Sequence, residues 1–237
     1  MYILSIETTG ILGSVALIDE KGKVFEAVSS ERMSHLRELV NLADQVIKEA
    51  GIEKSSITHV ACSVGPGSFT GIRIGVTTAR TIAQVLGVKC ISISSLEIFK
   101  EYCSEDQKVA VIFNARRGQV YGAVFGNNGE EILKPGPYML EDVLEVCKDL
   151  DDVVFYGDGI DAYGDKLEDY ALASIKDRYQ HASMVARAAV VKAEAGEVTD
   201  FGSLLPDYMR EAEAEQKLKD GTLEKQRKAK LARFMNC

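Results

Sequence analysis

The chain has 237 residues, 46% of them hydrophobic and 27% charged, which is typical of a globular protein. This composition excludes collagen, coiled coil and disorder as descriptions of the whole chain. No apolar run approaches the roughly 18 residues that a membrane span requires, and the N-terminus lacks the basic region of a secretory signal. The five cysteines are odd in number and never in CxxC spacing, so we expect reduced thiols in a cytoplasmic protein rather than disulfides or a zinc site.

The net charge of −8 is unevenly distributed along the chain. Residues 217–237 hold seven Lys/Arg and two acidic residues, a net charge of +5, so the rest of the chain carries −13. An acidic body argues against body-wide contact with nucleic acid, because such contact depends on cationic neutralisation of phosphates. The basic tail is either a solvated end, which such tails usually are, or a local contact for nucleic acid.

The first half of the chain predicts strands followed by helices. Short apolar runs separated by turn residues predict hairpin-connected strands, and apolar residues at i, i+3, i+4 and i+7 predict the first helix. The predicted strands are 2–7, 13–19, 23–29, 58–64 and 88–93, and the predicted helices are 34–50, 70–86 and 95–103.

The second half repeats this order, opening with a strand, a turn and a strand. The predicted strands are 108–114, 119–125, 130–133 and 153–156, with a loop at 135–137 and helices at 140–148, 183–195 and 207–219. We therefore predict a two-lobed α/β protein in which one motif occurs twice and the second copy is degenerate. The expected division is an N-terminal lobe at 1–104, a C-terminal lobe at 105–216 and a basic tail at 217–237.

Two turns have residues suited to anion binding. One is the Gly-rich turn before the helix at 70–86, and the other is the hydroxyl-rich turn after the first strand, because glycines permit close approach and a helix N-terminus attracts anions. The spacing matches neither a Walker A loop nor a dinucleotide fingerprint, so a tight structural turn is favoured. Ser68 or Thr70 is expected to cap the helix. The candidate nucleotide- or anion-binding residues are Thr8, Thr9, Gly65, Gly67 and Ser68.

The helix at 70–86 has small residues at every fourth position. Gly within a helix costs ~1 kcal/mol relative to Ala, so the presence of Gly75 indicates a close approach there. Such a stripe lets another helix pack tightly, either the helix at 34–50 of this chain or a helix of another subunit. For an intermolecular surface, the candidate partner-binding residues are Leu36, Leu39, Gly71, Arg73, Gly75, Ala79, Arg80 and Ala83.

Several segments of the chain resemble the TsaB (YeaZ) family over residues 2–216. The segments are IETTG, HVACSVGPGSFTGIRIGVTTARTIAQ, ISISSLE, NARRGQVYGAVF and LPDYMREAEAEQK. The resemblance implies an actin/Hsp70/sugar-kinase-like (ASKHA) fold of two related lobes, the second of them reduced. It also implies a role in the threonylcarbamoyl (t6A) modification of the tRNA adenosine next to the anticodon.

The family is similar to TsaD, the transferase that binds metal through two histidines in an N-H-L-E-G-H run. Aligned on Leu96 and Glu97, this chain has Ser95 and Phe99 at the two histidine positions, and neither residue can replace an imidazole ligand. The resemblance therefore implies a non-catalytic subunit that binds TsaD through the two helices at 34–50 and 70–86, or forms a homodimer through them. TsaE is a further expected partner.

The same resemblance sets the expectations for cofactors. No metal or cofactor of the chain's own is expected, whereas ATP and a metal ion are expected on the partner subunits. Contact with tRNA is expected only indirectly or through the tail at 217–237, and no membrane contact is expected. The family usually has Asp where Glu7 and Asn114 stand here, which weakens any nucleotide role for this chain.

Two alternative functions stay open at this point. One is an ATP-dependent phosphotransferase of the same fold, which would contact phosphate through Thr8, Thr9 and Asn114. The other is a tRNA-binding module that acts through the basic tail.

Overall fold

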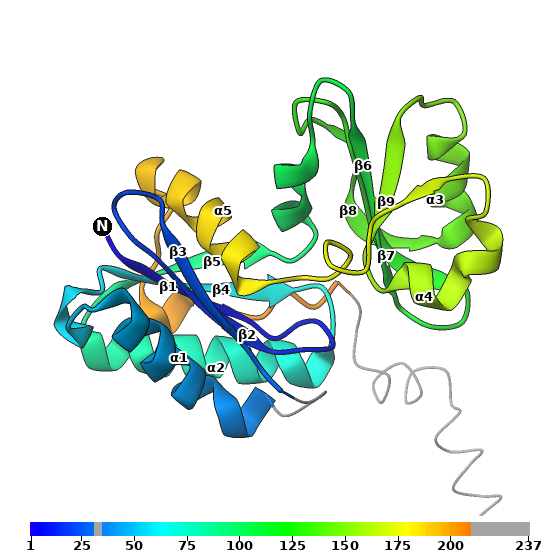
Figure 1. The fold of residues 1–237 in the computed structure, drawn as a ribbon. Helices are drawn as coiled ribbons and strands as arrows, with labels where there is room; N and C mark the ends of the chain where they lie inside the picture. The colour runs from blue at the N-terminus through cyan, green and yellow to red at the C-terminus, as the bar shows by residue number, and fades with distance from the viewer. Residues whose placement is uncertain (31–34, 210–237) are drawn as a thin grey trace, which may run out of the picture.

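The computed structural model describes residues 1–30 and 35–209, with side chains described from Glu38 onward in the first helix. It contains two five-stranded sheets, with strand orders β3-β2-β1-β4-β5 and β10-β9-β6-β7-β8 (Figure 1). The first sheet consists of β1 (Ile3–Glu7), β2 (Ser14–Ile18), β3 (Val24–Val28), β4 (His59–Gly65) and β5 (Lys89–Ser94). The second consists of β6 (Lys108–Asn114), β7 (Gln119–Phe125), β8 (Glu131–Met139), β9 (Val153–Tyr156) and β10 (Ala171–Leu172).

The two sheets have the same topology. β1 pairs antiparallel with β2 and parallel with β4, and β6 pairs antiparallel with β7 and parallel with β9. In each sheet an antiparallel three-stranded unit therefore extends on one side of its first strand, and parallel strands are added on the other side. The last strand is six residues long in the first sheet and only two in the second. The prediction of two related lobes, the second reduced, is confirmed.

Helices cover both faces of the first sheet (Figure 1). α1 (His35–Ala50) and α2 (Phe69–Leu86) lie on one face, and α5 (Ala182–Glu194) lies on the other. Successive side chains of a strand point to opposite faces, so Leu4 and Ile6 join the core beneath α1 and α2, whereas Ile3 joins the core beneath α5. The five buried residues of β1 show no hydrophobic–polar alternation for this reason.

The chain returns to the first sheet after it has completed the second. Thr199 pairs with Cys90 of β5, and Leu204, which follows η4 (Phe201–Ser203), is buried with the core beneath α1 and α2. The sequence had suggested a single C-terminal lobe at 105–216, but α5 and η4 lie with the N-terminal strands. An amphipathic helix shows which of its faces is buried and not which sheet buries it, and this explains the difference.

The second sheet is covered on one face by α3 (Leu140–Cys147) and α4 (Gly159–Tyr163). Its other face packs on η2 (Glu97–Tyr102), the segment at which a helix was expected. The Phe99 ring lies in this junction, with its centroid 6.0 Å from that of Phe113 and 5.6 Å from that of Tyr156. One hydrophobic core thus continues from the first lobe into the second. Two further short helices are η1 (Lys54–Ser56) and η3 (Gly164–Lys166).

Two local predictions differ from the structure. β8 continues through residues 135–137, where the sequence predicted a loop, and Pro137 pairs with Tyr121. β8 is an edge strand, so a proline that lacks an N–H can be accommodated there. Residues 207–209, predicted as the start of a helix, are not helical, and the rest of that segment lies outside the described residues.

No helix in the described part of the chain is long and apolar enough to cross a membrane.

Candidate functional site

The turn after β1 is buried and hydrogen-bonded within the chain. Thr8 is fully buried, and its Oγ1 donates to the carbonyl oxygen of Gly71 at 2.8 Å. Thr9 donates to Glu7 Oε1 through its backbone N–H at 2.5 Å and its hydroxyl at 2.6 Å. Ser63 Oγ donates to the other carboxyl oxygen, Glu7 Oε2. The turn is thereby joined to both β4 and the first turn of α2.

Glu7 is fully buried among these donors. Burial raises the pKa of its carboxyl, and hydrogen bonds from Ser63, Thr9 and Gly10 oppose that rise. The sequence identified Glu7 only as a departure from the usual Asp of the family. Its central place in the hydrogen-bonding of the turn depends on Ser63, which is 56 residues away in the chain.

The Gly-rich turn packs directly on the turn after β1. Ser68 N donates to Thr9 O at 2.8 Å, and a Cβ placed at Gly67 would lie only 2.6 Å from the same oxygen. Ser68 Oγ accepts from Gly71 N at 3.2 Å, which confirms the predicted cap of α2. A Cβ at Gly65 would meet the backbone oxygen of Asp207, so Gly65 is required by packing.

The structure thus brings together the five residues predicted to bind a nucleotide or anion. Their donor groups at Thr8, Thr9 and Ser68 are hydrogen-bonded to other groups of the chain. This arrangement matches the favoured alternative of a tight structural turn.

The small-residue stripe of α2 packs against the sheet beneath it. A Cβ at Gly71 would meet Thr8 O, and one at Gly75 would meet Thr8 Oγ1 and lie 3.2 Å from Cys62 Sγ. The close approach predicted at Gly75 therefore exists, but the approaching group is the turn after β1 and not another helix. Small residues at every fourth position show that something comes close, and they do not identify it.

This packing changes the partner-binding surface expected from the sequence. Leu39, Gly71, Gly75, Ala79 and Ala83 are buried within the chain itself, so these side chains do not form an outer surface. The Leu36 side chain lies outside the described residues. Arg73 is exposed and Arg80 is half-buried.

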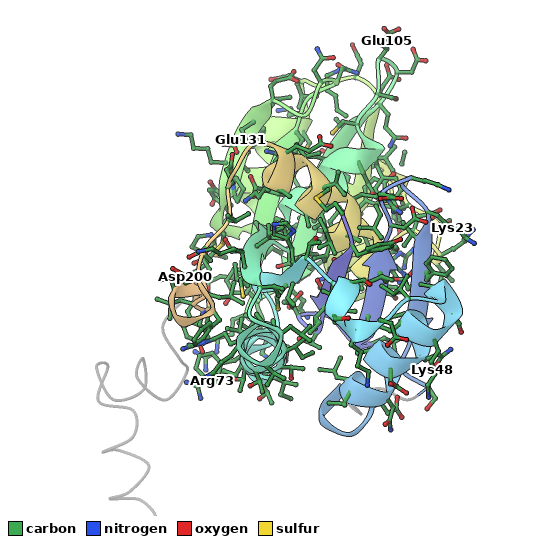
Figure 2. The ribbon with its side chains drawn as sticks, turned by 90° about the vertical axis from the view of Figure 1, so that its left-hand side faces the viewer. Lys23, Lys48, Arg73, Glu105, Glu131 and Asp200 are labelled. Carbon is green, nitrogen blue, oxygen red and sulfur yellow. The ribbon has the colours of Figure 1, made fainter. Side chains whose placement is uncertain are left out.

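The outward side of the same two helices carries a different set of residues. Val40 of α1 is 68% exposed and Val85 of α2 is 78% exposed, whereas Ile74 and Ile82 are half-buried. We call this surface the α1–α2 face, and its residues are Val40, Arg73, Ile74, Thr77, Thr81, Ile82 and Val85. Figure 2 shows Arg73 projecting from α2 on the side away from the sheet.

Arg73 is held in place by two aromatic residues. Its guanidinium carbon lies 4.1 Å from the centroid of the Phe69 ring, and its Nε donates to Tyr208 Oη at 2.9 Å. The two rings lie 4.6 Å apart between centroids. An arginine that is already ordered loses less conformational entropy when it binds a partner.

The corresponding turn of the second lobe is open. Asn114 is exposed, its N–H donates to Asp158 Oδ1 at 2.9 Å, and its side-chain oxygen accepts from Arg116 N at 2.8 Å. Arg116 and Arg117 have φ values of 67° and 57°, which are uncommon for residues other than glycine.

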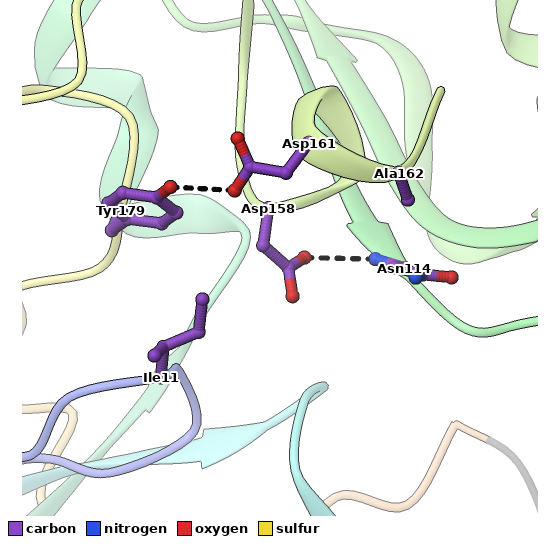
Figure 3. A pocket seen from close by; sticks show the side chains of 6 residues that line it. All are labelled: Ile11, Asn114, Asp158, Asp161, Ala162 and Tyr179. Carbon is purple, nitrogen blue, oxygen red and sulfur yellow. Dashed lines mark hydrogen bonds between the residues drawn. The ribbon is translucent and has the colours of Figure 1, made fainter. Parts of the chain in front are cut away.

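An open pocket of about 460 Å³ lies between the two lobes (Figure 3). It is lined by Ile11 of the first lobe and by Asn114, Asp158, Asp161, Ala162 and Tyr179. Burial raises the pKa of Asp158, and Asp161 accepts from Tyr179 Oη at 2.6 Å and from Arg178 at 2.6 Å. The two carboxyl groups make this lining unfavourable for a polyphosphate.

The two positions that the resemblance aligns with the histidines of TsaD, Ser95 and Phe99, are part of the core. Ser95 is fully buried and its hydroxyl donates to Pro66 O, and Phe99 is fully buried between the lobes. Within the described residues, no group of three or more His, Cys, Asp or Glu side chains is placed to hold a metal ion.

Comparisons with known proteins agree on the kind of protein that this chain resembles. The family model described as tRNA N6-adenosine threonylcarbamoyltransferase (TsaD) matches residues 28–218. The tRNA threonylcarbamoyladenosine biosynthesis protein TsaB of Bacillus subtilis (strain 168) is 32% identical over 224 residues, which cover 92% of this chain and 97% of the relative.

Solved structures show the same likeness. YeaZ from Pseudomonas aeruginosa has a TM-score of 0.71 and 25% identity, covering 87% of this chain and 99% of that one. The activator of the 2-hydroxyisocaproyl-CoA dehydratase from Clostridium difficile, with bound ADPNP, has a TM-score of 0.52 at 10% identity, covering 83% of this chain and 97% of that one. The second likeness is one of fold alone. Together with the topology, these neighbours confirm the predicted ASKHA fold.

Proposed function

Because this chain belongs to the TsaB family of tRNA threonylcarbamoyladenosine biosynthesis proteins, we propose that it is a non-catalytic subunit that binds and supports the TsaD transferase. The observation that carries the proposal is the burial of Ser95 and Phe99 in the core, at the positions of the two metal-binding histidines of TsaD. A hydroxyl bonded to Pro66 and a phenyl ring packed between the lobes cannot act as metal ligands. The proposal then assigns the chemistry of the modification to TsaD, and it expects the ATP and the metal ion on the partner subunits.

The proposed partner-binding surface is the α1–α2 face. Val40 and Val85 are largely exposed, and Arg73 is held against Phe69 and Tyr208. Arginine and tyrosine are enriched among the residues that dominate binding energy in protein interfaces, and uncharged apolar side chains are typical of the buried centre of an interface. The outward side of α1 and α2 therefore replaces the buried stripe as the expected contact. TsaE is the further partner, and a homodimer is expected when the chain is alone. The expected location of the chain is the cytoplasm.

The decisive experiment is size-exclusion chromatography with light scattering on the chain, alone and mixed with TsaD from the same organism. We expect a homodimer alone and a one-to-one complex in the mixture. The test variant is Val40→Asp on α1, and the matched control is Val191→Asp on α5. Both valines are about two thirds exposed, at 68% and 67%, but α5 covers the opposite face of the sheet.

The two variants separate the surface from the function. Val40→Asp is expected to weaken TsaD binding about tenfold or more, because a buried charge without a partner disrupts an apolar contact. Val191→Asp is expected to bind like the unmodified chain. Equal binding of TsaD by both variants would contradict the proposed surface. Failure of the unmodified chain to bind TsaD, with or without ATP, would contradict the proposed function itself.

One observation favours the phosphotransferase alternative, namely the open pocket between the lobes. Its two carboxyl groups and the internal bonding of Thr8 and Thr9 count against a bound nucleotide. ATP turnover by the purified chain that is lost in Thr9→Ala would favour this alternative.

The tail at 217–237 lies outside the described residues, so tRNA contact through it stays a prediction. Deleting the tail and measuring the affinity for tRNA tests it directly.

A further inference from the structure

Residues 201–208, which begin with η4, are a fixed part of the first lobe. Just before them, Thr199 exchanges two backbone hydrogen bonds with β5, each of 2.8 Å. Leu204 is fully buried in the core beneath α1 and α2, and Asp207 N donates to a backbone oxygen of β4 at 2.8 Å. Figure 2 shows η4 on the side of α2 that faces away from α1. The surface opposite the sheet therefore consists of α1, α2 and this segment.

Three large side chains of the segment are exposed to solvent. They are Phe201, Leu205 and Tyr208, of which Leu205 is 61% exposed and the two aromatic residues are each 38% exposed. Apolar side chains that gather on the surface of an ordered segment mark interaction sites. The segment thus has the kind of surface that a protein partner covers.

Tyr208 joins the segment to the α1–α2 face. Its ring lies 4.6 Å from the Phe69 ring between centroids, and its Oη accepts from Arg73 Nε at 2.9 Å. Because Arg73 belongs to the α1–α2 face, the exposed side chains of the segment continue that face. The α1–α2 face as defined above has far fewer residues than the roughly 20–30 per side of a standard interface, so a partner that covers it needs adjoining surface.

The Arg73 guanidinium has donors that the chain itself does not use. Its Nε is bonded to Tyr208, whereas its two Nη atoms have neither a hydrogen bond nor an ion pair in the described part of the chain. Arg178 and Arg187, by contrast, are both paired with carboxylates. A planar guanidinium binds a carboxylate through parallel N–H bonds. The protein group that best fits the outer edge of Arg73 is therefore an acidic side chain.

We propose that residues 201–208 form the third element of the TsaD-binding surface, and that Tyr208 positions the Arg73 guanidinium for an acidic side chain of TsaD. This inference rests on the proposed function, and it adds to the contact a segment that follows the second lobe in the chain. Phe201 and Leu205 supply apolar contact. Because the segment is fixed and Arg73 is already ordered, little conformational entropy is lost on binding.

The test measures the Kd for TsaD, without tRNA, of the variant Leu205→Asp. Its control is Ile175→Asp in the second lobe, because Ile175 is also largely exposed, at 74%. Leu205→Asp is expected to weaken binding about tenfold or more, since it places a charge without a partner in an apolar contact. Ile175→Asp is expected to bind like the unmodified chain. Both variants should keep its unfolding temperature, because both side chains are exposed.

Val40→Asp on α1 separates this inference from the proposed function. Weaker binding by Val40→Asp together with unchanged binding by Leu205→Asp would overturn the role of residues 201–208 and leave the proposed function standing. An unmodified chain that does not bind TsaD would overturn both.

Two other occupants of the segment would show themselves in Leu205→Asp. A lost homodimer with unchanged TsaD binding would assign the segment to a second copy of the chain. A lower unfolding temperature with unchanged TsaD binding would assign it to another part of the same chain. Either result would overturn the proposal.

The positioning role of Tyr208 is tested by a double-mutant cycle with Arg73. Tyr208→Phe keeps the ring on Phe69 and removes the hydroxyl, and it is expected to weaken TsaD binding about threefold. Arg73→Gln is expected to weaken binding about tenfold and to reduce its dependence on salt. Tyr208→Phe should then have no further effect in Arg73→Gln. Equal effects of Tyr208→Phe with and without Arg73 would overturn the positioning role.

Discussion

The turns after β1 and β6 occupy equivalent places in two sheets of the same topology, but one is buried and the other is open. In the first lobe, glycines after β4 pack on the turn itself, since Gly67 lies against Thr9 and Gly71 lies against Thr8. In the second lobe, the glycines after β9 pack on β6, the strand that precedes the open turn.

Gly157 and Gly159 of the second lobe both lie against Ile112 O, two residues before β6 ends. The turn that follows is left without such cover, and it is closed by its own backbone, with φ values of 67°, 57° and 77° at residues 116–118. The same strand–turn–strand unit can thus be closed by packing from another segment or by its own conformation. The way in which the turn is closed depends on the position at which the glycines contact the first strand or the turn that follows it.

The largest expected effect is at Gly71. Replacing it with alanine places a Cβ against the backbone oxygen of Thr8, which cannot move without shifting the turn. We expect Gly71→Ala to reduce the free energy of unfolding by about 3 kcal/mol, measured by urea denaturation.

The control for this substitution is Gly164→Ala in the second lobe. Gly164 has a φ of −49° and no atom within 4 Å of an added Cβ, so its change is expected to stay within about 0.5 kcal/mol. Equal stability of the Gly71→Ala variant and the unmodified chain would show that the first turn is not closed by packing.

A smaller effect is expected at Gly118, in the turn closed by its backbone. Its φ is +77°, and an added Cβ would meet only Met139 Cε at 3.4 Å, which is an ordinary contact. Gly118→Ala should therefore cost only the left-handed conformation, about 1 kcal/mol, again measured in urea. A loss as large as that of Gly71→Ala would remove the contrast between the two turns.

The smallest effect concerns Asp158 beside the second turn. Burial raises the pKa of this carboxyl above its ordinary value of 3.8, so the folded state holds the proton more tightly than the unfolded state. The folded protein must then lose stability as the pH rises from 3.8 through the folded pKa. Asp158→Asn keeps an oxygen that can accept from Asn114 N and removes the charge.

We therefore expect Asp158→Asn to be more stable than the unmodified chain at pH 7, by about 0.5 kcal/mol. Below the unfolded pKa the difference should disappear. The measurement is the unfolding temperature of both proteins as a function of pH. A parallel pH dependence of the two proteins would show that Asp158 does not contribute to it.

Much of the local structure follows from the sequence because it depends on neighbouring residues. The cap of α2 by Ser68 requires only a hydroxyl three residues before Gly71, and the structure has that hydrogen bond. The proline-containing part of β8 could not be predicted in this way. Whether Pro137 interrupts a strand depends on whether that strand lies at an edge of its sheet, which the local pattern does not show.

The candidate site likewise has features that the sequence predicted and features that it could not predict. The sequence indicated that the residues at 8–9 and 65–71 are unusual, and that Gly75 requires a close approach. It could not show that the approaching group is Thr8, because Thr8 and Gly71 are 63 residues apart. The small residues of α2 allow close contact with the turn and the sheet beneath the helix, whereas the sequence pattern was interpreted as contact with another helix.

By itself, the sequence determined most of the strands, the main helices, the repetition of the motif and the family of this protein. These depend on periodicity, capping and motif spacing, which act over a few residues. The tertiary structure alone decided that α5 returns to the first sheet, that the stripe of α2 faces inward, and that Ser63 of β4 donates to the Glu7 carboxyl. Each of these is a contact between distant segments, and its energy depends on which surfaces are left uncovered when the two sheets form.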